Sequence, residues 1–150
     1  MRIGVFVDAE NVRYNGGYQM RYDVLRRFAA REKGILQRLN TYLAFDLERA
    51  REDQEYAKKS RAYQQMVRDF GWKITVKYVR RYTDENGNVT TKANADMDLA
   101  IDALLQARNL DRIILLTGDG DFIRLVLALQ NMGCRVEVIG FNHVSSELKE

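Results

Sequence analysis

Residues 112–140 read RIILLTGDGDFIRLVLALQNMGCRVEVIG and decide the fold. The stretch predicts an apolar strand at residues 112–116, a helix at residues 122–132 that ends before Gly133, and a strand at residues 135–140. A strand, a helix and a second strand in close succession are typical of a parallel sheet with crossover helices.

The same alternation continues through the rest of the chain. Further strands are predicted at residues 2–7, 35–45 and 72–82, and helices at residues 20–31, 47–70 and 95–108. Asn86-Gly87 is a tight-turn signal after the third of these strands. We therefore expect one domain over residues 1–150, an α/β three-layer sandwich in which helices cover both faces of a central, mostly parallel sheet. The final SSELKE predicts the first turn of another helix, which suggests that the domain's C-terminal helix is truncated.

The composition is that of a globular protein, with 46% hydrophobic and 30% charged residues in 150. No apolar run approaches the length of a membrane span, so we expect no membrane association. Cys134 is the only cysteine, which excludes a disulfide within one chain and a zinc site built on several cysteines. These features favour a cytoplasmic location.

Charge is distributed unevenly along the chain. Residues 13–92 hold 18 Lys and Arg against 10 Asp and Glu, a net charge of +8, whereas the remaining residues hold 6 against 11, a net charge of −5. Basic surface binds polyanions through counterion release. For most of these basic residues, a solvated helix face is the preferred interpretation.

Acidic residues occur where the predicted elements end or begin. Asp8 follows the first strand, Asp119 follows the RIILL strand, and Asp121 lies two residues later. Because parallel strands end at the same edge of a sheet, we expect Asp8 and Asp119 to lie close together. Asp96 begins a helix on the side that carries Ala100, Ala103, Leu104 and Ala107, so it is expected to face the core and this edge.

Clustered carboxylates repel one another unless a cation compensates them. Mg²⁺ prefers oxygen ligands and suits a site made of Asp alone. Two such ions can activate water and stabilise the leaving oxygen of a phosphodiester.

Each position also has a purely structural explanation. Asp121 could cap the helix at residues 122–132, and Asp96 could complement a helix dipole. Asn11 could form an Asx turn, and Thr117 could satisfy backbone groups at its strand end. Asp98 and Asp102 are interpreted first as solvated and second as ligands.

Three segments resemble the NYN family, which is the LabA-like branch of the PIN-like nuclease superfamily. The segments are IGVFVDAENV from Ile3, KANADMDLAIDALL from Lys92 and IILLTGDGDFIRLVLALQNMGCRVEVIGF from Ile113. The resemblance covers nearly the whole chain and is weakest in its middle third. It implies a PIN-like sandwich and a Mg²⁺- or Mn²⁺-dependent ribonuclease.

The resemblance also assigns roles to individual residues. The acidic ligands and catalytic groups fall on Asp8, Asp96, Asp119 and Asp121. Asp102 matches a position that is often acidic in the family, and the Asn of the first motif falls on Asn11. We expect single-stranded RNA as the partner, bound by Asn11, Thr117, Arg80, Arg81 and Lys92, with Tyr78 and Tyr82 offering stacking faces. Apolar positions on the helix at residues 47–70 also allow a homodimer.

Two other functions compete with this one. A non-catalytic RNA-binding or regulatory module would keep the fold and the basic surface without turnover. A haloacid-dehalogenase-like phosphatase would need an Asp two residues after a nucleophilic Asp8, and Glu10 occupies that position.

Overall fold

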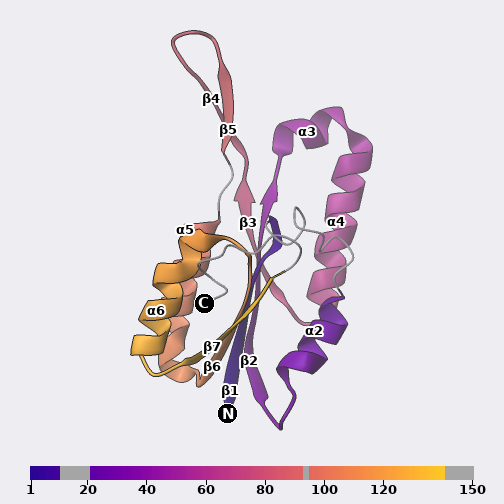
Figure 1. Cartoon of the computed structure of the whole chain (residues 1–150). Coiled ribbons are helices and arrows are strands. Elements are labelled where there is room, and N and C mark those ends of the chain that lie inside the picture. Colours follow the sequence, from indigo (N-terminus) through magenta and orange to yellow (C-terminus); the bar gives the residue numbers. More distant parts are fainter. Residues whose placement is uncertain (11–20, 93–94, 141–150) are drawn as a thin grey trace.

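The computed structural model describes residues 1–10, 21–92 and 95–140, without the side chains of residues 90–92 (Figure 1). Its central sheet has five parallel strands in the order β3-β2-β1-β6-β7. These strands are β1 (Arg2–Asp8), β2 (Ile35–Phe45), β3 (Lys73–Tyr78), β6 (Arg112–Leu116) and β7 (Arg135–Ile139). The α/β fold with a parallel sheet is confirmed. Residues 141–150, including the predicted SSELKE helix, lie outside the described residues.

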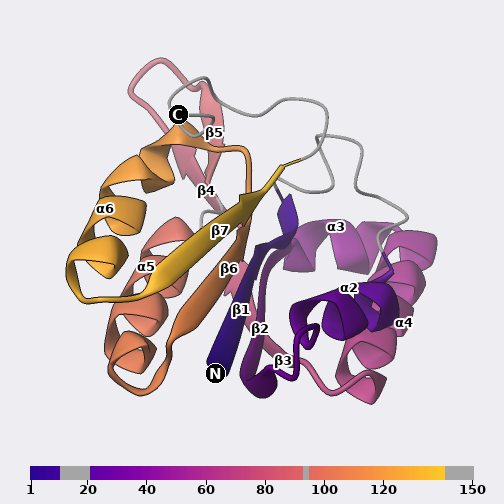
Figure 2. The same cartoon turned by 60° about the horizontal axis from the view of Figure 1, so that its bottom comes forward.

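Helices form a layer on each side of the sheet, as Figure 2 shows. One layer contains α2 (Tyr22–Ala29), α3 (Leu47–Glu52) and α4 (Gln54–Asp69). The other contains α5 (Asp96–Gln106) and α6 (Ile123–Asn131). Short 3-10 turns follow α5 (η1, Ala107–Asn109) and precede α6 (η2, Gly120–Phe122). Among the described residues, no helix is long and apolar enough to cross a membrane.

The sheet separates two hydrophobic cores, and strand β1 contributes to both. Ile3, Val5 and Val7 face the layer of α2 and α4, whereas Phe6 faces the layer of α5 and α6. This division follows from the two-residue period of a strand. A strand buried on both faces has an almost continuous apolar sequence, which is why β1 and β6 were easily predicted.

The predicted helix at residues 47–70 is wrong as a single element. It is broken at Asp53, whose backbone is extended (φ −124°, ψ 96°). The Asp53 carboxylate accepts a hydrogen bond from the Tyr56 backbone N–H at 3.1 Å and so caps α4. Asp46 caps α3 in the same way through Arg49. Asp competes for backbone donors in this manner, so it favours a helix start over a helix interior.

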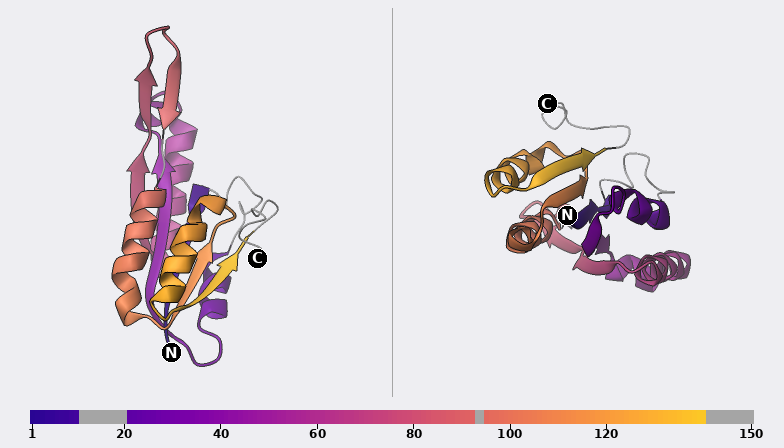
Figure 3. Two further views of the ribbon diagram at one scale, coloured as in Figure 1. Left: turned by 60° about the vertical axis from the view of Figure 1, so that its left-hand side comes forward. Right: turned by 90° about the horizontal axis from the view of Figure 1, so that it is seen from below.

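The predicted strand at residues 72–82 is also divided. Its first part is β3, at one edge of the sheet, and its second part is β4 (Arg80–Thr83), which pairs with β5 (Val89–Lys92) in an antiparallel hairpin. Figures 1 and 3 show this hairpin extending beyond the sheet at the end where the strands terminate. Gly87 has a φ of +78°, and the Asp84 carboxylate accepts hydrogen bonds from the backbone of Asn86 and Asn88, so the turn forms where Asn86-Gly87 predicted it.

The two faces of α6 give a matched test of this packing. Leu129 is fully buried beneath α6, whereas Leu127 on the same helix is 50% exposed. We expect Leu129→Ala to lower the free energy of unfolding by about 2–5 kcal/mol. Leu127→Ala should change it by only about 0.5 kcal/mol. Urea denaturation of both variants checks the prediction, and equal effects would contradict the burial described here.

Candidate metal centre

Two strands that are adjacent in the sheet end at the candidate site. The strand order reverses between β1 and β6, and their pairing runs as far as Val7 opposite Leu116. The next residues, Asp8 and Thr117, therefore emerge side by side at the carboxyl ends of the strands. Open α/β sheets bind ligands at this kind of reversal, because the loops on either side diverge and leave a crevice.

Thr117 joins the two strand ends through its side chain. Its hydroxyl donates a hydrogen bond to Asp8 Oδ2 at 3.0 Å and accepts one from the backbone N–H of Asp119 at 3.1 Å. Both Thr117 and Asp8 are buried. The hydroxyl thus positions the loop that follows β6 relative to the Asp8 carboxylate, and direct substrate binding by Thr117 stays a prediction.

The loop after β6 is ordered by its own acidic side chains. Asp119 Oδ1 accepts a hydrogen bond from the Asp121 backbone N–H at 2.9 Å, which caps the η2 turn. The capping function considered for Asp121 therefore belongs to Asp119, because a 3-10 turn begins before α6. The carboxylate of Asp121 lies within that turn and is exposed.

Three of the four predicted carboxylates gather at this position. Asp96, the first residue of α5, joins Asp119 and Asp121, and one oxygen from each lies within 4.8 Å of the others. Asp8 is outside this group and is connected to it through Thr117. Three oxygen donors of this kind fit a hard divalent cation. Asp96 and Asp119 are half-buried, so mutual repulsion is less screened than at a fully exposed site.

A second polar network lies next to this group, between α5 and the sheet. The Tyr42 hydroxyl donates a hydrogen bond to Asp102 Oδ2 at 2.8 Å, and Asp98 pairs with Lys77 of β3 at 3.5 Å. Burial, and then the hydrogen bond to Asp102, raises the pKa of Tyr42 far above its usual value. The prediction that Asp102 is solvated is wrong, because strand β2 supplies a buried partner that lies far away in the sequence. The side chain of Asp98 is 37% exposed and pairs with Lys77 of β3.

The buried face of α5 also differs from the predicted one. Leu99, Ala103 and Ala107 pack against the sheet, whereas Leu104 is more than one-third exposed and Ala100 is half-buried. Asp96 still begins the helix on the buried side, three residues before Leu99.

The predicted RNA-binding residues are in different situations. Arg80 is exposed on the hairpin. Arg81 pairs with Asp46 at 2.5 Å and with Glu48 at 2.7 Å, so its guanidinium ties the hairpin to α3. Asn11 and the side chain of Lys92 lie outside the described residues.

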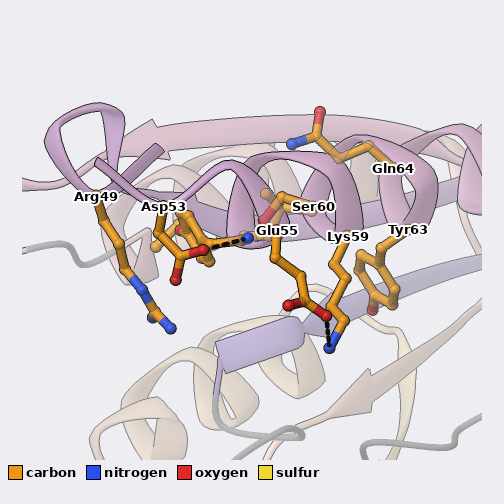
Figure 4. Close-up of a pocket in the computed structure, with 10 residues that line it drawn as sticks. Arg49, Asp53, Glu55, Lys59, Ser60, Tyr63 and Gln64 are labelled. Atoms are coloured by element: carbon orange, nitrogen blue, oxygen red, sulfur yellow. Dashed lines mark hydrogen bonds and ion pairs between the residues drawn. The ribbon is translucent and has the colours of Figure 1, made fainter. Parts of the chain in front are cut away.

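A pocket of about 500 Å³ lies elsewhere, between the end of β2 and helices α3 and α4 (Figure 4). Tyr56 and Tyr63 contribute rings to its lining, and Lys59 pairs with Glu55 at 3.2 Å. The Arg49 guanidinium already covers the Tyr56 ring at 4.2 Å from its centroid. The acidic group and this pocket share no lining residue.

Comparison with known proteins places the chain in a family. The NYN domain model matches residues 2–150, and the chain therefore belongs to the NYN family, whose members are typically nucleases. The Glu10 carboxylate accepts a hydrogen bond from the Ala44 backbone N–H at 3.2 Å.

Two relatives extend the comparison. The chain is 27% identical over 144 residues to the Low amplitude and bright protein LabA of Synechococcus elongatus, covering 92% of this chain and 73% of that protein. The fold of this chain is also similar to that of VPA0982, a Vibrio parahaemolyticus protein of unknown function. The TM-score is 0.78 and the sequence identity 25%, and the match covers 98% of this chain and 86% of that one.

The bridging hydroxyl of Thr117 can be tested against a second buried threonine. Thr117→Val leaves Asp8 and the Asp119 backbone N–H without this partner, so we expect a loss of about 1–3 kcal/mol in the free energy of unfolding. Thr41 is also fully buried, but its hydroxyl makes no hydrogen bond within the described part of the chain. Thr41→Val should therefore be neutral or stabilising. Equal losses in denaturant titrations would contradict a bridging function.

The raised pKa of Tyr42 has a consequence at alkaline pH. An unfolded tyrosine ionises near pH 10, whereas Tyr42 stays protonated in the folded protein. Its contribution to stability is therefore complete below about pH 10 and is lost as the pH rises above that value. Ultraviolet titration should show that Tyr42 ionises only with unfolding. Tyr42→Phe should reduce the amplitude of that late transition by one tyrosine, and an unchanged amplitude would contradict the assignment.

Proposed function

We propose that this protein is a Mg²⁺- or Mn²⁺-dependent ribonuclease that hydrolyses RNA phosphodiester bonds at the carboxyl edge of its sheet. The observation that carries the proposal is the convergence of Asp96, Asp119 and Asp121, within 4.8 Å, in a member of the NYN family. A metal-binding group of acids, at the end where α/β sheets bind ligands, suits the hydrolysis of a phosphate ester.

The carboxylates of Asp96, Asp119 and Asp121 would hold the cation, with Asp8 contributing from the adjoining strand end. A bound divalent cation would lower the pKa of water and offset the charge that develops on the phosphate. Asp119 has two tasks, since one of its oxygens fixes the η2 turn through the Asp121 backbone N–H. Thr117 keeps Asp8 and this turn at a fixed separation. These contacts hold the acidic side chains in place before substrate arrives, which reduces the reorganisation needed in the reaction.

The β4–β5 hairpin is the element best placed to extend the RNA-binding surface. It extends from the same end of the sheet as the acidic group, and Arg80, Tyr78 and Tyr82 are exposed. A cation beside aromatic rings suits the backbone and bases of single-stranded RNA. We also propose a cytoplasmic location, where RNA is accessible.

The decisive experiment is cleavage of a labelled single-stranded RNA with Mn²⁺, with Mg²⁺ or with EDTA. We expect metal-dependent cleavage by the wild type and a loss of at least about 100-fold in Asp119→Asn. The amide oxygen of Asn can still accept the hydrogen bond that caps the η2 turn, whereas the negative charge that would hold the cation is removed. Calorimetric titration with Mn²⁺ should show weaker binding by the same variant.

Asp98→Asn is the matched control, because Asp98 lies two residues from Asp96 on α5 but pairs with Lys77. It should retain cleavage, and circular dichroism should show that both variants are folded. Cleavage that survives EDTA and Asp119→Asn would contradict the proposal. RNA binding without cleavage by the wild type would favour the regulatory module instead.

A further inference from the structure

The pocket between the end of β2 and helices α3 and α4, here called the α4 pocket, lies at the same edge of the sheet as the acidic group. Leu43 and Ala44 of β2 line it. Leu43 directly follows Tyr42, which lies opposite Asp8 in the strand register. The Ala44 backbone N–H donates a hydrogen bond to Glu10, two residues after Asp8. Because β1 and β2 are parallel, both sites lie at the carboxyl ends of neighbouring strands, where open α/β sheets bind ligands.

The α4 pocket contains a platform on which a planar group can stack. The Tyr56 ring is stacked on that of Phe45, with ring centroids 5.8 Å apart and an angle of 15° between the planes. The Arg49 guanidinium lies 4.2 Å from the centroid of the Tyr56 ring and belongs to an exposed residue. The Tyr56 hydroxyl accepts a hydrogen bond from the Asp46 backbone N–H at 3.1 Å, so the ring is held in place without a ligand. Unpaired nucleobases stack on both aromatic rings and guanidinium planes.

The rest of the lining favours a base over a free phosphate. Two cationic and two anionic side chains balance one another there, namely Arg49 and Lys59 against Asp53 and Glu55 (Figure 4). Lys59 pairs with Glu55 at 3.2 Å, so its charge is already compensated. A bare phosphate would meet no net positive charge, whereas an uncharged base needs none. The volume of about 500 Å³ lies in the range of pockets that bind small organic molecules.

We propose that the α4 pocket binds one base of the single-stranded RNA whose backbone is cleaved at the acidic group. The inference rests on the proposed function and adds a second contact to it. Arg49 and Tyr56 hold the base by stacking, and this anchors the strand at the carboxyl edge of the sheet. Every base has a planar face, so the pocket tolerates different sequences. A base that is paired and stacked in a duplex cannot enter, so the pocket selects single strands.

Binding of a labelled oligoadenylate in EDTA, measured by fluorescence anisotropy, tests the inference independently of cleavage. An abasic oligomer of the same length reports the contribution of the backbone alone, and the wild type should bind it less tightly than the oligoadenylate. Arg49→Ala should lose about 10-fold in affinity for the oligoadenylate and far less for the abasic oligomer, because only stacking is removed. The Arg49 backbone N–H that Asp46 accepts at the start of α3 is retained, so the variant should fold like the wild type.

Two further variants separate stacking from charge. Arg49→Lys keeps the positive charge without the planar group, so its binding should resemble that of Arg49→Ala. Arg51→Ala removes the same charge from an exposed position on the same helix, outside the pocket lining, and should weaken both oligomers slightly and equally.

Two outcomes would overturn the inference. One is binding of both oligomers by Arg49→Ala that equals their binding by Arg51→Ala. The other is tighter binding of adenosine monophosphate than of the oligoadenylate, which would assign the pocket to free nucleotides. A wild type that prefers the oligoadenylate in this way but never cleaves RNA would support the base-binding pocket and contradict the ribonuclease activity alone.

Discussion

The parallel pairing of β1 with β6 is the constraint on which the rest of the structure depends. Both strands are buried on both faces, so a shift of one residue would move each apolar side chain to the opposite core. That register places Asp8 next to Thr117 and starts the loop that carries Asp119 and Asp121. The Thr117 hydroxyl then joins the two ends at hydrogen-bonding distance. The strand pairing therefore sets where Asp8 and the loop with Asp119 and Asp121 begin.

Helix α5 supplies the remaining carboxylate and has to be held by contacts of a different kind. Its inner face packs in the core beneath the sheet, and the hydrogen bond from Tyr42 to Asp102 anchors its middle to β2. Asp96, one and a half turns earlier, is thereby held at the sheet edge. Tyr42 and Asp102 thus contribute to the geometry of the acidic group.

The divided elements show where local patterns are insufficient. The apolar spacing at residues 47–70 is compatible with one helix, but Asp53 captures the Tyr56 backbone N–H and begins a second one. The alternation at residues 72–82 is compatible with one strand. Strand β2 ends at Phe45, opposite Tyr78, so the chain beyond Val79 has no strand of the central sheet to pair with. It leaves the sheet, and β4 pairs with β5 as a hairpin. Arg81 consequently meets Asp46 and Glu48, which no local pattern indicated.

The sequence by itself determined the parallel α/β fold, the family and the position of the acidic residues at element ends. These features depend on local periodicity and on short motifs, which survive without knowledge of distant contacts. Tertiary structure alone decided that Thr117 bridges to Asp8, and that Asp98 and Asp102 have partners on β3 and β2. Each of these contacts depends on the three-dimensional path of the chain, and the partners of Asp8, Asp98 and Asp102 come from distant strands. A side chain's environment is set by whatever packs against it, and residue spacing within one element does not contain that information.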